Sequence, residues 1–204
     1  MPTEGKVPAR ELKRRQTRER LLGAAISEFR RKGMVAAEVG EIVSAAGVAH
    51  GTFFFHFPTK EHVLIELERR EEERMAEELT RFFKKSPDLP SALTEIVRVL
   101  LALEHRLGTT LFKDFLALHF STTRPPQEEW RQHPVIVAVV EELERARDRG
   151  DIPAGTDVFY NAVFFLLGLY ALLITIPDIA SVREPVIEKY VTTALHGMLG
   201  PSGS

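Results

Sequence analysis

The chain has 204 residues, no cysteine and a formal net charge of −2 at pH 7, with 44% hydrophobic and 27% charged residues. This composition argues for a globular protein and excludes a disulfide framework and a thiolate metal site. The charge is uneven, because residues 1–60 hold 11 Lys and Arg against 6 Asp and Glu, a net of +5. Residues 61–204 hold 16 Lys and Arg against 23 Asp and Glu, a net of −7. A basic N-terminal third predicts a module that binds a polyanion, although an accidental charge gradient would look the same.

Residues 1–20 are polar and lack the apolar centre of a secretory signal. The absence of cysteine fits a reducing compartment. We therefore expect a cytoplasmic protein.

Nearly every segment has helical periodicity, and glycine or proline separates the segments. Residues 1–14 are expected to form a basic N-terminal arm. His133-Pro134 should kink or split the seventh helix, and Ser181 with Glu184 should form the capping box of the ninth. The sequence thus predicts an all-α fold of about nine helices, at about 16–32, 38–45, 49–56, 59–84, 91–107, 109–121, 127–149, 157–176 and 182–199.

The second and third helices, joined at Ala46-Gly47-Val48, have the spacing of a helix-turn-helix, with Gly47 predicted in the left-handed conformation. In such a motif the second helix lies in the DNA major groove. Phe53 and Phe57, four residues apart, are predicted core positions. Because successive helical residues turn by about 100°, Phe55 should be at least partly exposed, where it can touch a thymine methyl.

The run "IVSAAGVAHGTFFFHFPTK", residues 42–60, follows a first helix of fitting length. Over about residues 15–65 the chain resembles the DNA-binding domain of the tetracycline-repressor (TetR) family of bacterial regulators. The resemblance implies a DNA-binding domain at 15–75, with its helix-turn-helix at about 38–57, and a helical ligand-binding and dimerisation domain at 76–204. It also implies a homodimeric repressor that binds a palindromic operator in double-stranded DNA and is released by a small molecule.

The same resemblance implies roles for individual residues. Gly51 and Thr52 would lie where the recognition helix comes closest to DNA, and Lys60 corresponds to a phosphate-clamping lysine. Basic residues of the leader would approach the DNA backbone or the minor groove. The predicted DNA-contacting set is therefore His50, Gly51, Thr52, Phe54, Phe55, His56 and Lys60, with Lys13, Arg14 and Arg18 from the leader.

Two positions depart from the family pattern. At position 54 the family usually has a tyrosine whose hydroxyl reaches a phosphate, and Phe54 cannot make that bond. Where the family usually starts its second helix with Thr or Ser, this chain has Ala37 and Glu38. The Glu38 carboxylate suits a helix N-terminus but would repel a nearby phosphate.

The C-terminal part is rich in Phe, Leu and Val, which favours a lipophilic effector. The segments at 157–176 and 182–199 have broad apolar surfaces, and the resemblance implies that they pair with their symmetry mates in a four-helix dimer interface. The candidate lining of the effector site is His105, Phe112, Phe115, His119, Trp130, Tyr160 and Phe164.

Other functions stay open at this point. Residues 158–176 carry no formal charge and are long enough to span a membrane, so a single-pass regulator is one alternative. A helical ligand-binding or catalytic protein that has lost DNA binding is another. The sequence has no phosphate loop, nucleophile elbow or paired-acid motif, and its histidines form no helical pair with a supporting carboxylate. We therefore expect no catalytic residue, no cofactor and no metal site.

Overall fold

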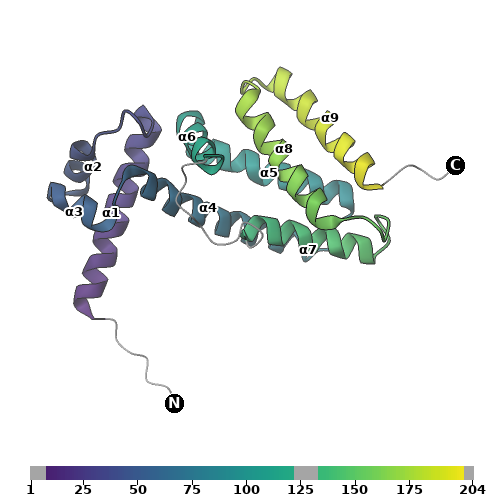
Figure 1. Ribbon diagram of the computed structural model, residues 1–204, viewed down its shortest axis with the longest axis horizontal. Helices are drawn as coiled ribbons and strands as arrows, with labels where there is room; N and C mark the ends of the chain where they lie inside the picture. Colours follow the sequence, from purple (N-terminus) through teal and green to yellow (C-terminus); the bar gives the residue numbers. More distant parts are fainter. Residues whose placement is uncertain (1–7, 122–132, 200–204) are drawn as a thin grey trace, which may run out of the picture. The chain divides into compact units, whose positions relative to one another are not determined.

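The computed structural model describes residues 8–121 and 133–199, and in these ranges it contains nine α-helices and no strand (Figure 1). The predicted all-α fold class is confirmed. The helices are α1 (Ala9–Lys32), α2 (Val39–Ala46), α3 (His50–His56), α4 (Lys60–Phe83), α5 (Leu89–Leu107), α6 (Thr109–His119), α7 (Pro134–Asp148), α8 (Val158–Thr175) and α9 (Ala180–Leu199).

The chain divides into two compact units. Unit 1 comprises Met1–Glu68 and Leu107–His119, and unit 2 comprises Arg69–Arg106 and Phe120–Ser204. Helix α6 belongs to unit 1, in which it packs against α1.

Unit 1 has its core where α1, α2 and α3 meet, and these three helices lie together in Figure 1. The apolar stripe of α1 is buried as its spacing predicts, with Leu22, Ala25 and Phe29 at 0–3% exposure. Ile42 of α2 is also fully buried. The burial of one stripe from each helix fixes the orientation of the helix-turn-helix within the unit.

Two helix starts differ from the sequence prediction. The basic arm expected at 1–14 is helical from Ala9, because Pro8 stands at the N-cap and Glu11 pairs with Arg14 and Arg15 one turn on. Helix α9 begins at Ala180, which places Ser181 inside the helix and not at its cap.

Helix α7 begins at Pro134, which occupies its first turn, and His133 is its N-cap. The expected helical segment before it, at 127–132, lies outside the described residues.

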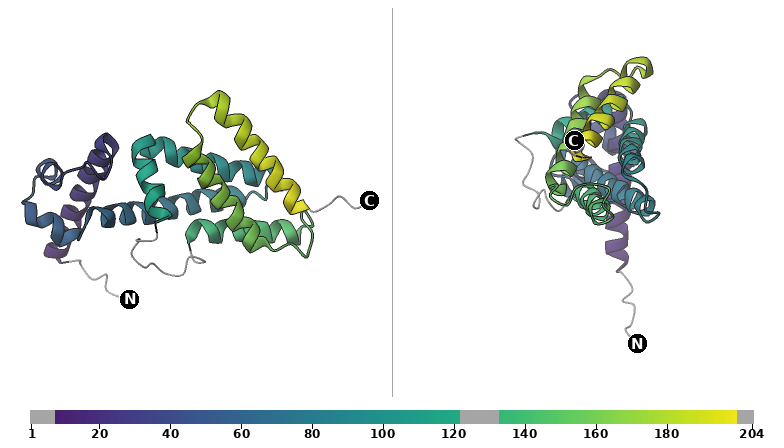
Figure 2. Two further views of the ribbon diagram at one scale, coloured as in Figure 1. Left: turned by 45° about the horizontal axis from the view of Figure 1, so that its top comes forward. Right: turned by 90° about the vertical axis from the view of Figure 1, so that its right-hand side faces the viewer.

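Unit 2 is organised around α8, which packs against α7 and α9 (Figures 1 and 2). Gly168 allows the close approach of α9, because a Cβ atom there would lie 2.5 Å from the Tyr190 hydroxyl. That hydroxyl donates to the Phe165 carbonyl at 2.5 Å. The start of α9 is fixed to α5 by a buried ion pair of 2.5 Å between Arg183 and Glu104.

Within the described residues, α8 is the one helix long and apolar enough to cross a membrane, with a mean hydropathy of 2.0. Its buried residues, including Phe165, Leu169 and Leu173, form the core of unit 2. A helix that serves as the core of a folded unit meets the same length and composition test as a membrane span.

Candidate nucleic-acid interface

The turn between α2 and α3 has the conformation that the sequence predicts. Gly47 lies in the left-handed region with φ of 63°, and the Val48 amide donates to the Val43 carbonyl at 3.0 Å. This C-terminal cap ends α2 and allows α3 to start at His50. The position preceding α2 is Glu38, whose side chain is exposed and makes no capping hydrogen bond in the described structure.

The four phenylalanines of residues 53–57 separate into two environments. Phe53 and Phe57 are fully buried, which confirms their predicted core positions. Phe55 is 72% exposed, as expected, and Phe54 is 49% exposed. Phe54 packs edge-on against Phe53 and lies 5.6 Å from the His50 ring, so its exposed side is turned away from the core. The recognition helix therefore presents two aromatic rings to solvent.

The remaining residues of α3 complete this surface. His50 and Gly51 are exposed, and Thr52 and His56 are half-buried. Burial, together with the charges of Arg18 and Arg14, lowers the pKa of His56. The positively charged form of the His56 imidazole is therefore disfavoured in the free protein.

An open groove of about 510 Å³ lies beside α3 in unit 1. It brings together residues that the sequence analysis assigned to DNA from two separate segments, the leader and the recognition helix. Arg10, Lys13 and Arg14 of α1 are exposed there and carry its positive charge. The lining is Pro8, Arg10, Glu11, Lys13, Arg14, Thr17, Thr52, Phe55 and His56.

Arg18 has a different environment from the other basic residues of the leader. Its guanidinium donates to the His56 carbonyl at 2.5 Å and lies 4.2 Å from the centre of the Phe57 ring. It also pairs with Glu66 at 3.3 Å. These contacts hold the C-terminal end of α3 against α1 and α4. Arg18 thus positions the recognition helix, a role that its sequence context does not reveal.

Lys60 is likewise engaged inside unit 1. Its ammonium group donates to the carbonyls of Met34, Val35 and Ala37, at 2.7, 3.0 and 2.9 Å. An ammonium has three protons, so these bonds account for all of them. In this structure Lys60 fixes the loop that leads into α2, and a phosphate contact would require it to give up one of these carbonyls.

The same loop is held from α6 by a residue that the sequence analysis did not identify. The Met34 amide donates to the Asp114 carboxylate at 2.5 Å. Arg30, near the end of α1, donates to the Leu107 carbonyl at 3.1 Å. These partners are 77 and 80 residues apart in the chain, so no local pattern could predict them.

An ion-pair network joins the end of α1 to α2. Arg31 pairs with Glu28 at 2.7 Å and with Glu41 at 2.8 Å, and Lys32 also pairs with Glu41 at 2.8 Å. The hydrogen bond from Arg31 lowers the pKa of the Glu28 carboxyl. The network fixes the orientation of α2, which supports the recognition helix.

The candidate effector residues lie in several environments. Phe112 and Phe115 are buried on α6, whereas His105, Tyr160 and Phe164 are exposed. The exposed rings of α8 face away from the core of unit 2, which does not support a lining role inside this unit. Trp130 lies outside the described residues.

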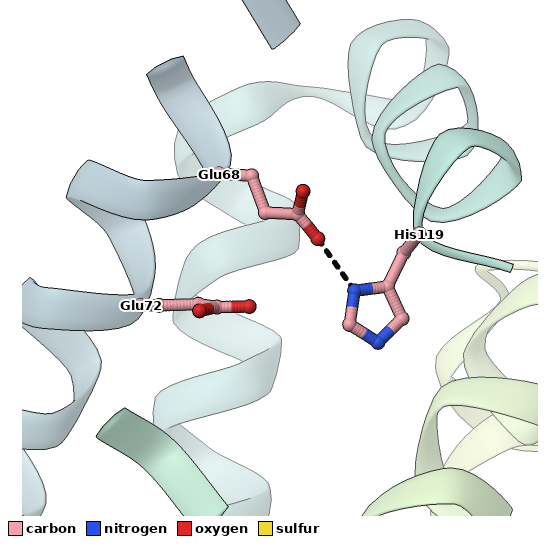
Figure 3. A group of neighbouring side chains, drawn as sticks. All are labelled: Glu68, Glu72 and His119. Atoms are coloured by element: carbon pink, nitrogen blue, oxygen red, sulfur yellow. Dashed lines mark hydrogen bonds and ion pairs between the residues drawn. The ribbon is translucent and has the colours of Figure 1, made fainter. Parts of the chain in front are cut away.

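His119, at the end of α6, is turned toward the buried carboxylate of Glu68 on α4, with Nδ1 2.5 Å from Oε1 (Figure 3). This contact joins the end of α6 to α4.

Comparison with known proteins agrees with this geometry. The profile of the bacterial regulatory proteins of the tetR family matches residues 21–67. The HTH-type transcriptional regulator AcrR of Shigella flexneri is 33% identical over 83 residues, which cover 40% of this chain and 39% of that protein. The HTH-type transcriptional regulator YdgC of Bacillus subtilis is 28% identical over 206 residues, which cover 93% of this chain and 95% of that protein.

Among solved structures, FadR of Thermus thermophilus, described as a TetR-family transcriptional repressor in complex with lauroyl-CoA, superimposes with a TM-score of 0.67. It is 24% identical, and the match covers 92% of this chain and 99% of that chain. The structural match shows the shared fold, and the profile match shows the shared helix-turn-helix. Residues 21–67 of the chain thus form a DNA-binding domain of the tetR family of bacterial regulatory proteins.

Proposed function

We propose that the protein is a repressor that binds a palindromic operator as a homodimer and is released by a small lipophilic effector. The observation that carries this proposal is the surface of unit 1, where the exposed side of α3 adjoins the Lys13 and Arg14 side chains. A recognition helix beside basic groups suits a major groove flanked by phosphates. The proposed site of action is the cytoplasm, where bacterial operator DNA is found.

The homodimer is proposed from the apolar surface of unit 2. Exposed apolar residues recur along one face of α8, at Tyr160, Phe164, Leu167 and Ile174, and exposed valines at 182 and 186 add to it on α9. Their spacing of three, four or seven residues places the α8 side chains in one stripe. A stripe of this kind on two adjacent helices suits a self-complementary interface of four helices around a two-fold axis. The dimer would provide two recognition helices for two half-sites.

The lipophilic effector is proposed from the composition of the C-terminal part and from a structural relative. The FadR structure of Thermus thermophilus holds lauroyl-CoA. A long-chain acyl-CoA is therefore the first effector to test, with an unesterified fatty acid and coenzyme A alone as controls. Release of operator DNA by the acyl-CoA alone would support this effector class, and release by none of the three would contradict it.

The test of the proposed function is selection of bound fragments from genomic DNA by the full-length protein at moderate salt. Enrichment of fragments that share one pseudo-palindrome supports the proposal. Recovery of the input distribution would instead favour the alternative of a helical ligand-binding or catalytic protein without DNA binding. The absent capping bond at Glu38 and the phenylalanine at position 54 are the features that favour this alternative.

A further inference from the structure

The recognition helix α3 lacks the side chains that commonly read purine bases. Its sequence is HGTFFFH, with no Arg, Lys, Asn, Gln, Asp or Glu. Guanine is most often read by a bidentate Arg or Lys and adenine by a bidentate Asn or Gln, while cytosine donates to Asp or Glu. None of these pairings is available from α3. Hydrogen bonding to base edges is limited to His50, Thr52 and His56.

The most exposed phenylalanine ring of α3 is that of Phe55, at 72%. Its one ring contact in the described structure is with the neighbouring His56, edge-on at 5.1 Å between centroids. Phe54 is less exposed, at 49%, and leans toward Phe53 and His50. Phe55 lines the groove beside the basic residues of α1, whereas Phe54 does not, so Phe55 is the aromatic group of α3 that adjoins the basic surface.

We propose that Phe55 reads a thymine through its C5-methyl group, so that each operator half-site contains a thymine whose methyl packs against this ring. This inference rests on the proposed function, because it requires α3 to enter the major groove. The thymine methyl is the principal apolar feature of that groove, and an aromatic ring pressed against a base edge elsewhere would cover polar atoms without a hydrogen bond. Specificity at this base pair therefore comes from burial of a methyl group.

The proposal makes a chemical prediction about the DNA. Uracil pairs as thymine does but lacks the methyl, so a thymine-to-uracil change removes the contact and keeps every hydrogen bond. Burial of one such group corresponds to about a fourfold change in affinity. We expect about fourfold weaker binding for uracil in one half-site and roughly fifteenfold for both.

The experiment starts with an operator selected from a random-sequence duplex library by the full-length protein. Each thymine of the half-site is then replaced by uracil in turn, and affinity is measured by fluorescence anisotropy. A uracil outside the half-sites is the DNA control. The expected result is one thymine per half-site whose replacement weakens wild-type binding about fourfold.

Two matched variants assign the effect to the residue. Phe55→Ala should bind the thymine and uracil duplexes equally. Phe54→Ala, on the adjacent exposed ring, should bind both more weakly but keep the fourfold ratio. Both side chains are exposed, so thermal unfolding should show intact folding for each variant. A selected operator that is insensitive to uracil at every position, or a ratio that survives Phe55→Ala, overturns the inference. Failure to select any operator would instead overturn the proposed function.

Discussion

The fold of the free protein does not require a glycine at position 51. Gly51 lies in α3 with an ordinary backbone conformation, and a Cβ atom at this position would meet no atom within 4 Å. Alanine should therefore stabilise the free protein by about 0.5–1 kcal/mol, because glycine loses more backbone entropy in a helix. If α3 comes closest to DNA here, the added methyl should weaken operator binding roughly tenfold.

Gly23→Ala in α1 is the control, because that glycine also has open space around it. It should raise the unfolding temperature to a similar extent and leave operator affinity unchanged. Equal affinity of Gly51→Ala and wild type would show that α3 does not approach DNA closely at this residue.

Phe54 lacks the hydroxyl that the family places at its position. The ring is 49% exposed, so a tyrosine hydroxyl can be added without burying a polar group. We predict that Phe54→Tyr tightens operator binding by about 1 kcal/mol, the contribution of one hydrogen bond to a phosphate. A filter-binding titration measures this directly. No gain in affinity would place position 54 away from the DNA backbone.

Replacement of Lys60 distinguishes a phosphate contact of this side chain from a structural role. Because its ammonium holds three carbonyls, Lys60→Ala should lower the free energy of unfolding by about 1–3 kcal/mol and leave the salt dependence of DNA binding unchanged. Lys13→Ala, at an exposed position of the groove, should instead reduce the salt slope by about one phosphate.

Urea unfolding and operator titrations over a range of salt concentrations separate the two cases. Suppose instead that Lys60→Ala has wild-type stability and that the salt slope of its DNA binding is smaller by about one phosphate. Lys60 would then have the phosphate-binding role that the family resemblance implies.

At the scale of the helices, the exposed stripe of α8 predicts how the chain assembles. Phe164 is 66% exposed near the middle of the stripe. Phe164→Glu should convert a dimer into a monomer at micromolar concentration, because it introduces a charge into an apolar interface. Operator affinity should then fall about a hundredfold, since each recognition helix would bind alone.

Val137→Glu is the matched control, because Val137 is 39% exposed on α7, outside the proposed interface. Analytical ultracentrifugation should show a dimer for this variant. A monomeric wild-type protein, or a dimeric Phe164→Glu variant, would remove α8 from the interface.

Much of the fold could be predicted because its signals are local. Gly47 ends α2, Pro134 starts α7, and the stripe of Leu22, Ala25 and Phe29 identifies the buried face of α1. The first turns of α1 were missed because they are polar on all sides and are held by ion pairs from Glu11. A polar helix without an apolar stripe cannot be distinguished from a polar tail by periodicity.

The site could be predicted only in part. Phe53, Phe55 and Phe57 followed from helical geometry, because residues on adjacent positions face different directions. The roles of Arg18 and Lys60 did not follow, since their partners are 23 to 48 residues away in the chain. A basic side chain has the same sequence signature whether it binds a phosphate or a backbone carbonyl.

For the whole molecule, unit 1 carries the apolar recognition surface, and unit 2 is proposed to dimerise and to bind an effector. The proposed dimer recognises a defined operator through α3. The full chain is needed for this recognition, because two recognition helices must be presented together to bind a pseudo-palindrome.

Selection of bound fragments from genomic DNA, with wild type and Phe55→Ala compared at the same moderate salt, tests whether the dimer recognises a defined operator. Wild type should enrich fragments that share a pseudo-palindrome, with half-site centres separated by multiples of about 10–10.5 base pairs. Phe55→Ala should lose preference at one base pair of each half-site. Recovery by wild type of fragments without a shared sequence would show that the protein does not recognise a defined operator through α3.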